Sequence, residues 1–183
     1  MAIKTFTTGE VLTASDTNTY LANAGLVYIT ATTVSAQTTV AIDSCFTTTY
    51  AHYFVTFNLT SSLTGQYTAV RLRAGGTAKA TNYDRAGLVA TTGGALASDS
   101  GGTAQTEYRI SGQSTAMIAG AFYVYNPQVS GTTAFNGSST YPNYYASGAT
   151  QTETYSADGF QIFASGNAAT YTGTVRVYGL RQA

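Results

Sequence analysis

The chain has 183 residues, enough for one domain with a sizeable core, or for one domain plus an arm. Only 9% of the residues are charged, against about a quarter in ordinary soluble domains, and eight basic residues balance eight acidic ones. Nucleic acids and anionic membranes are bound by clustered Lys and Arg, so we expect neither as a partner. The 44% hydrophobic content, with 15 Tyr and 8 Phe, excludes a disordered chain and favours a turn-rich β protein.

Cysteine content and hydropathy narrow the class of protein further. Cys45 is the one cysteine, so an intramolecular disulfide or a thiolate metal cluster within one chain is excluded. The N-terminus lacks the apolar stretch of a signal peptide, and no run approaches the roughly 18 apolar residues of a membrane span. We therefore expect synthesis in a cytoplasm, no membrane insertion and no cofactor.

The chain opens with a segment unlike everything that follows. Thr13 is a suitable helix N-cap, and Asp16, three residues later, is a shorter version of the acidic residue in a capping box. Asn23 or Gly25 can end the helix, because both tolerate a left-handed conformation. We predict a helix of roughly ten residues within 13–24, too short to be stable alone in water.

This opening segment has few apolar side chains, so it needs a surface to dock on. Either the body of the protein covers it, as an arm over a sheet edge, or another chain does. The apolar side chains are Phe6, Val11, Leu12, Tyr20 and Leu21.

The same stretch, Phe6-Thr-Thr-Gly-Glu-Val-Leu-Thr-Ala-Ser-Asp-Thr-Asn-Thr-Tyr-Leu21, resembles the N-terminal signature of many tailed-phage virion proteins. That signature begins with a Phe, two small residues and a Gly. An acidic residue or Gln follows, and then Val or Thr, Leu, Thr-Ala-small-Asp, any residue and an Asn. A short helix comes next. It opens fibre, spike and head-decoration proteins. The resemblance covers about a tenth of the chain. It implies that residues 1–25 are an anchoring arm whose apolar side chains attach the protein to a phage particle.

After Gly25 the hydrophobic pattern changes to a period of two, which is typical of strands. The clearest strand is 52–60, where Tyr53 and Phe57 point one way while His52 and Phe54 point the other. Residues 35–37 read as a turn, 43–50 as a single helical turn, and the glycine-rich 91–103 as an exposed loop. Strands are predicted at 26–34, 38–42, 52–60, 67–74, 82–90, 106–111, 117–125, 159–165 and 171–180, with short ones at 132–135 and 144–146.

About ten short strands, with turn signals roughly every 8 to 12 residues, predict an antiparallel sandwich over residues 26–183. This body also resembles the jelly-roll domain that often follows the N-terminal motif. We therefore predict an all-β fold: an antiparallel jelly-roll β-sandwich with a short N-terminal arm and helix. The pieces that carry the resemblance, in order, are Phe46-x-x-x-Tyr50-x-x-Tyr53 leading into Phe57-Asn-Leu-Thr60, Val70-Arg-Leu-Arg73-Ala-Gly, Asn126-Pro127, Asp158-Gly-Phe160 and Gly173-Thr-Val-Arg-Val-Tyr-Gly179.

No motif marks a catalytic or metal-binding site. Cys45 and His52, the one histidine, are seven residues apart across a predicted turn, and no Gly-x-Ser-x-Gly elbow marks a serine nucleophile. The eight acidic residues are dispersed, so neither a glycosidase pair nor a calcium loop stands out. An enzyme that acts on cell-surface glycan is therefore the weakest of our hypotheses, and we predict no catalytic, cofactor-binding or metal-binding residues.

Five tyrosines fall in the loop-rich last third of the chain. Tyrosine is favoured at recognition and sugar-binding sites because it offers a flat apolar face and a hydroxyl. These residues either form a recognition surface for a host-cell glycan or receptor, or pack over one end of the sandwich or between subunits. They are Tyr141, Tyr144, Tyr145, Tyr155 and Tyr171.

Together these features predict a non-enzymatic protein of a tailed-phage virion, made in the host cytoplasm. So few charges suit a surface covered by partners, and we expect a homotrimer bound to phage capsid or tail proteins. The main hypothesis is a capsid decoration protein, either a cement protein or a head spike. The alternative is a short tail fibre or receptor-binding tip, which the small size disfavours because fibres carry long shafts.

Overall fold

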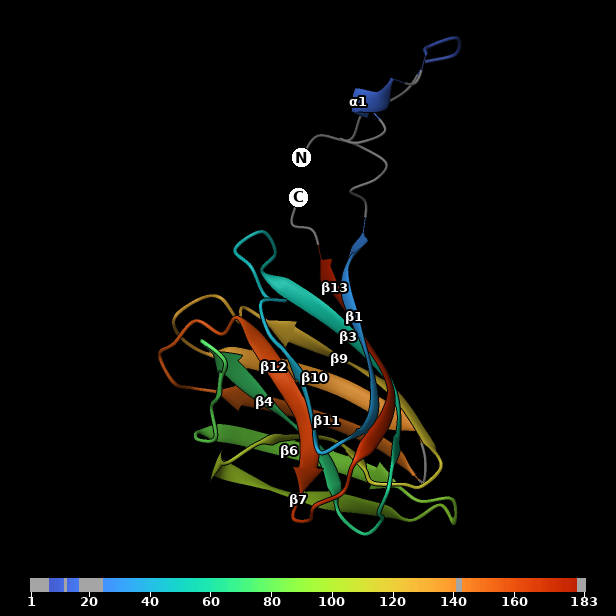
Figure 1. The fold of residues 1–183 in the computed structure, drawn as a ribbon, viewed down its shortest axis with the longest axis vertical. Helices are drawn as coiled ribbons and strands as arrows, with labels where there is room; N and C mark the ends of the chain where they lie inside the picture. The colour runs from blue at the N-terminus through green and yellow to red at the C-terminus, as the bar shows by residue number, and fades with distance from the viewer. Residues whose placement is uncertain (1–6, 12, 17–24, 141–142, 181–183) are drawn as a thin grey trace.

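The computed structural model describes residues 7–11, 13–16, 25–140 and 143–180, and the chain after residue 25 forms two antiparallel sheets packed face to face (Figure 1). The large sheet has the order β1-β13-β3-β9-β10-β11-β6-β7, and the small sheet has the order β2-β12-β4-β5, with β8 also paired to β4. The strands are β1 (Leu26–Gln37), β2 (Thr39–Ile42), β3 (His52–Ser61), β4 (Tyr67–Ala74), β5 (Thr77–Ala78), β6 (Tyr83–Ala90), β7 (Leu96–Gln105), β8 (Tyr108–Gly112), β9 (Met117–Tyr125), β10 (Thr133–Thr140), β11 (Tyr144–Gln151), β12 (Gly159–Ser165) and β13 (Tyr171–Leu180).

The two ends of the body pair with each other. β1 pairs with β13 in the large sheet, and β2 pairs with β12 in the small one, both antiparallel. The paired ends thus wrap together from one sheet to the other, as the chain does in a jelly roll. The prediction of an all-β, antiparallel jelly-roll sandwich is confirmed.

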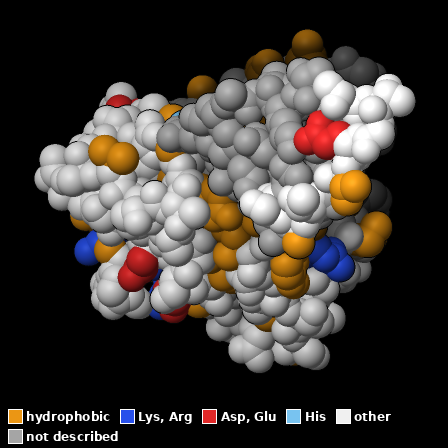
Figure 2. All heavy atoms as spheres, turned by 90° about the horizontal axis from the view of Figure 1, so that it is seen from above, with side chains coloured by type: hydrophobic (Ala, Val, Ile, Leu, Met, Phe, Trp, Pro, Cys, Tyr) orange, Lys and Arg blue, Asp and Glu red, His pale blue; other side chains and the backbone are white. Residues whose placement is uncertain are grey.

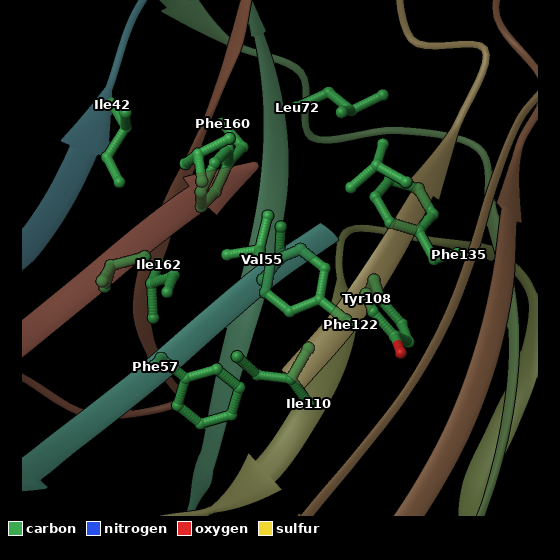
Figure 3. Close-up of a cluster of buried hydrophobic side chains, with 14 of the residues drawn as sticks. Ile42, Val55, Phe57, Leu72, Tyr108, Ile110, Phe122, Phe135, Phe160 and Ile162 are labelled. Carbon is green, nitrogen blue, oxygen red and sulfur yellow. The ribbon is translucent and has the colours of Figure 1, made fainter. Parts of the chain in front are cut away.

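The core forms where the inward side chains of the two sheets interdigitate (Figure 3). Phe122 of β9 meets Phe160 of the facing strand β12 edge to face, with ring centroids 5.7 Å apart. Phe57 of β3 lies 6.3 Å from Phe122, and Tyr108 of β8 lies 5.0 Å from Phe135 of β10. The inward set predicted for β3 is buried, as expected: Tyr53, Val55, Phe57 and Leu59.

Residues 7–11 and 13–15 of the N-terminal arm are exposed. A short helix, α1 (Ala14–Asp16), follows Thr13 directly, which agrees with the predicted N-cap. The rest of the helix predicted within 13–24 lies outside the described residues. α1 lies beyond the end of the sandwich at which β1 begins (Figure 1).

The glycine-rich stretch predicted as a loop at 91–103 is instead largely strand β7, which pairs with β6. Gly101 lies so close to β6 that an added Cβ would come within 2.2 Å of the Arg85 carbonyl oxygen. Asp99, on the same strand, is held by Arg109 at 2.8 Å. Contacts with neighbouring strands, rather than local propensity, therefore keep this segment extended.

Three further local predictions are wrong for a similar reason. Residues 43–50 form no helical turn, because the Phe46 amide donates to the Asp158 carbonyl at 3.0 Å and the Phe46 ring packs on Phe160. β10 and β11 are longer than predicted, because they form a continuous ladder with each other. The turn predicted at 35–37 belongs to β1 instead.

Both edges of the large sheet are irregular. β1 is one edge, and its pairing with β13 shifts register between Tyr28 and Thr30 and again between Val34 and Gln37. β7 is the other edge, and its pairing with β6 also shifts register twice. Such bulges bend a strand and increase its local twist.

Gly120 tests the packing of the core. An added Cβ there would come within 2.5 Å of the Phe57 ring and 2.8 Å of the Ser138 carbonyl oxygen. We expect Gly120→Ala to lower the free energy of unfolding by about 1–3 kcal/mol, because a well-packed core resists an extra methyl group. Gly148→Ala is the matched control, since its Cβ would meet only the Phe135 carbonyl oxygen, at 3.4 Å. Urea unfolding compares the two variants, and equal losses would contradict the packing described.

Candidate ligand-binding face

The outer face of the large sheet carries a cluster of partly exposed rings, which we call the aromatic wall. Because β3 and β9 turn alternate side chains into the core, Phe54 and Tyr123 point outward, and the register places them directly opposite each other. Their ring centroids are 4.9 Å apart. The wall continues through Tyr178, 6.3 Å from Phe54, to Tyr28, 5.9 Å from Tyr178, and Tyr125 stacks on Tyr123 at 6.0 Å.

Beside the aromatic wall the same face is hollowed into a groove of about 1090 Å³. The strand register explains the hollow. The cross-strand row that contains Tyr123 continues through Asn136 of β10, Gly148 of β11 and Ala86 of β6. Because the side chains on these strands are small, the surface they form, which we call the floor of the groove, lies lower than the aromatic wall. A second row runs alongside through Ala121, Ser138, Ala146 and Leu88.

The groove presents neutral groups to solvent. The two charged residues among its described lining, Arg85 and Asp99, are only 7% and 4% exposed. The Arg85 guanidinium donates to Glu107 at 3.0 Å, and Asp99 accepts hydrogen bonds from Arg109 at 2.8 Å and from the Tyr145 hydroxyl. Their charges are thus compensated beneath the groove, and the exposed polar side chains along it are amides and hydroxyls.

Glu107 is the centre of this internal ion cluster. Its carboxylate accepts hydrogen bonds from Arg85 and Ser165, both at 3.0 Å, and from the Thr106 hydroxyl, while Arg109 lies 3.6 Å away. Burial opposes ionisation of Glu107, but the hydrogen bonds from Thr106, Arg85 and Ser165 outweigh burial and lower its pKa. The ionised carboxylate ties the start of β8 to β6 and to the end of β12.

Two of the five tyrosines predicted as a recognition surface are buried, so the prediction is wrong for them. Tyr145 is 2% exposed, and Tyr171 is 0% exposed. The Tyr145 hydroxyl donates to Asp99, and the Tyr171 hydroxyl bonds with that of Thr68 at 3.0 Å. Burial raises the pKa of both phenols.

The remaining predicted tyrosines are not gathered on one surface either. Tyr144 is 52% exposed and lines the groove on the side away from the aromatic wall. Tyr155 is half-buried, packs against the core and lies 5.2 Å from the Lys79 ammonium. Tyr141 lies outside the described residues. Tyr144 is thus the one member of the described set that reaches the groove.

The predicted attachment residues fall almost entirely outside the described part of the chain. Val11 is described and is 78% exposed, so its side chain is free of the sandwich. Phe6, Leu12, Tyr20 and Leu21 lie outside the described residues. Attachment through these side chains stays a hypothesis.

Cys45 and His52 lie on opposite sides of the large sheet and do not form a nucleophile–base pair. Cys45 belongs to the core, its Sγ lies 3.6 Å from the Ile42 carbonyl oxygen, and burial raises the pKa of its thiol to about 12. A thiol with this pKa is not a nucleophile near neutral pH. His52 faces outward and packs edge-on against Tyr125 at 5.3 Å.

Sequence reasoning missed both the aromatic wall and the groove. A signal for the wall was present, because β3 and β9 have aromatic residues on both faces, such as Phe54 beside Tyr53 and Tyr123 beside Phe122. A solvated sheet face is usually polar, so rings on the second face indicate a surface that contacts something else. The groove has no local signal, because its rows depend on which strands pair.

The sequence matches no known family model and no curated protein. Among solved structures, the galectin LEC-6 of Caenorhabditis elegans is similar, with 13% identity and a TM-score of 0.37 over 82% of this chain and 94% of the galectin. A likeness this distant bears on neither the family nor the function of the chain.

The described part of the chain has neither a metal-binding cluster nor a membrane-spanning helix. There, no three or more His, Cys, Asp and Glu side chains are arranged to hold a metal ion. Within the same residues, no helix has the length and hydrophobicity needed to span a membrane.

The outer face of the large sheet therefore offers two kinds of contact to a ligand: stacking on aromatic rings, and hydrogen bonds from uncharged groups beside them.

Glu107→Gln tests the internal ion cluster. The substitution leaves the arginines without their buried carboxylate, so we expect the free energy of unfolding at neutral pH to fall by about 3 kcal/mol. The lowered pKa of Glu107 predicts the pH dependence. Its ionised form contributes stability fully above the unfolded-state pKa of about 4.3, and this contribution is lost as the pH falls through the folded-state pKa.

Urea unfolding from neutral pH to about pH 3 should therefore show a steeper acid loss in the natural protein than in the Gln variant. Glu153→Gln is the control, because its carboxylate accepts hydrogen bonds from Thr81 and Asn82 near the surface. Parallel pH profiles for the natural protein and Glu107→Gln would contradict the role given to this carboxylate.

Proposed function

We propose that this chain is a non-enzymatic structural protein of a tailed-phage virion, and more closely a capsid decoration protein of the cement or head-spike type. The observation that carries the proposal is an arm whose described residues are exposed and take no part in the core of the body. Among the described residues, the buried core cluster runs from Val40 to Val177 and has no member in the arm. The resemblance of the stretch from Phe6 to Leu21 to virion anchoring sequences supports an attachment role for that arm.

The chemistry of the interior supports a non-enzymatic role. Cys45 is a buried thiol with a raised pKa, and His52 packs on an aromatic ring. The carboxylates of Asp99 and Glu107 are held by arginines inside the sandwich, where they act as structural ion pairs. Each of these four side chains is thus occupied in packing or in an ion pair.

The surface supports self-association, and a homotrimer suits the virion appendages that the N-terminal stretch resembles. Charged side chains are few and scattered at the end of the molecule from which the arm leaves (Figure 2). Several large apolar side chains of the body are more than half exposed, among them Leu26, Leu96 and Met117. A surface this poor in charge favours association, and closed symmetric assemblies are the usual result. Three arms on one trimer would bind a particle with avidity.

One observation favours the alternative, a short tail fibre or receptor-binding tip. The groove beside the aromatic wall has the concave shape and the mixture of rings and polar groups typical of ligand sites. A decoration protein uses such a site for contacts away from the particle, whereas a receptor-binding tip depends on it. Both roles place the protein on the virion after its synthesis in the host cytoplasm, next to capsid or tail proteins.

Attachment through the arm is tested by a truncated chain that begins at Gly25 and by the double variant Leu12→Asp, Leu21→Asp. We expect both to fold like the full chain and to lose binding to particles that lack this protein. Burying each large apolar side chain contributes about 1.5–3 kcal/mol, so losing a few removes most of the affinity. Circular dichroism reports folding, and co-sedimentation with particles reports binding. A folded truncated chain that still decorates particles would place the attachment surface on the body.

Self-association is tested by light scattering at micromolar concentration. We expect a mass three times the 19.0 kDa of one chain, because the surface has too few charges to favour a free monomer. The truncated chain that begins at Gly25 shows whether the body or the arm holds the subunits together. A 19.0 kDa particle for the full chain would contradict the trimer.

A further inference from the structure

We propose that the groove and the aromatic wall beside it bind a neutral oligosaccharide, that is, an uncharged chain of several sugar rings. The site is the outer face of the large sheet between Phe54 and Tyr123 on one side and Leu88 and Tyr144 on the other. This inference concerns the body alone and does not rest on attachment of the arm to a particle.

The wall supplies the apolar half of such a site. One face of a sugar ring is covered by C–H groups, and it stacks on the flat face of an aromatic side chain. Phe54 and Tyr123 are both half-buried, so part of each ring remains accessible. They lie opposite each other on two central strands, and Tyr178 and Tyr125 pack beside them. The rings are therefore held in place before a ligand arrives, which reduces the entropy lost on binding.

The floor supplies the polar half. Asn136 is exposed and lies next to Tyr123 across the β9–β10 ladder, and Ser138 is exposed one outward position further along β10. An amide and a hydroxyl both donate and accept hydrogen bonds, as sugar hydroxyls do. Stacking groups on the wall and hydrogen-bonding groups on the floor thus match the two kinds of surface that a sugar ring presents.

The charges beneath the groove argue against an anionic ligand. Arg85 is the one cation in its described lining, and that side chain is buried against Glu107. Asp99 is likewise buried against Arg109, so the site does not select a cation either. An uncharged ligand complements this surface, because it leaves no charge to be desolvated without a partner.

The strand pairing argues against an extended peptide. A peptide strand adds to a sheet at a free edge, where backbone N–H and C=O groups are unpaired. The groove lies mainly over β9, β10, β11 and β6, each of which has a partner strand on both sides, and its lining extends to Ser98, Asp99, Gly101 and Gly102 of the edge strand β7. Along the four inner strands the backbone is already engaged in ladders, so recognition over most of the groove must come from side chains.

The size of the groove sets the length of the ligand. Its volume of about 1090 Å³ is at the upper end of small-molecule sites, which typically enclose about 300–1,000 Å³. A single sugar ring would leave most of it filled with water. We therefore expect affinity to rise with the number of sugar units.

The test uses the full chain against an array of immobilised neutral and anionic oligosaccharides, followed by titration calorimetry with the neutral one that binds best. Tyr123→Ala removes the centre of the wall and should weaken binding about tenfold. Ser138→Phe places a ring in the floor of the groove and should abolish binding. Ser138 is exposed in a β-strand, where aromatic residues are well tolerated, so this variant should still fold. Thr140→Phe is the matched control, because Thr140 is exposed on the same face of the same strand but outside the groove. It should bind like the natural protein.

The outcomes separate this site from its alternatives. Binding that both groove variants weaken and Thr140→Phe leaves intact, with unchanged melting temperatures, supports the proposal. An array with no bound glycan, binding of anionic glycans alone, or binding that Ser138→Phe leaves unchanged would overturn it. A Ser138→Phe chain that changes oligomeric state would also overturn it, since the groove would then be an interface between copies. The truncated chain that begins at Gly25 should keep its glycan affinity even if the arm proves to have no part in attachment.

Discussion

The register between β3 and β9 is the constraint on which both the core and the outer face depend. Phe57 and Phe122 lie on the inner side of this pair and meet the small sheet, while Phe54 and Tyr123 lie on its outer side and form the aromatic wall. Because side chains alternate with a period of two, a slip of one residue would exchange the two sets. One ladder therefore builds the interior and the outer face together, and selection on either constrains the other.

The sequence predicts what depends on local pattern, and fails where a neighbouring strand decides. The strand at 52–60 was predicted with its two faces because its alternation is complete within nine residues. β7 was missed because Gly101 and Asp99 are held by other strands, not by their own propensity. Tyr144 and Tyr145 are adjacent, so one points out and the other in, and only the pairing of β11 fixes which. The groove is a product of pairing across six strands, from β3 to β7 in the order of the large sheet, and no stretch of sequence contains it.

The distribution of charge is more uneven than the composition suggests. Of the few charged side chains, Arg85, Asp99 and Glu107 are buried in one cluster, and Arg109 joins them. An interior that uses this many ions leaves an outer surface with even less charge than 9% of residues implies. The same cluster keeps the groove neutral, so the low surface charge and the character of the proposed ligand have a common structural origin.

The irregular edges of the large sheet have a consequence for how copies of the chain can associate. A long, regular edge strand is a template on which an identical chain can continue the sheet, and repeated addition leads to fibres. β1 spans twelve residues and is rich in Thr and Val, which makes it a strong template by composition. Its two bulges, and those between β6 and β7 at the opposite edge, break the straight row of donors and acceptors that such growth requires. The bulges thus oppose open-ended polymerisation of a weakly charged β protein.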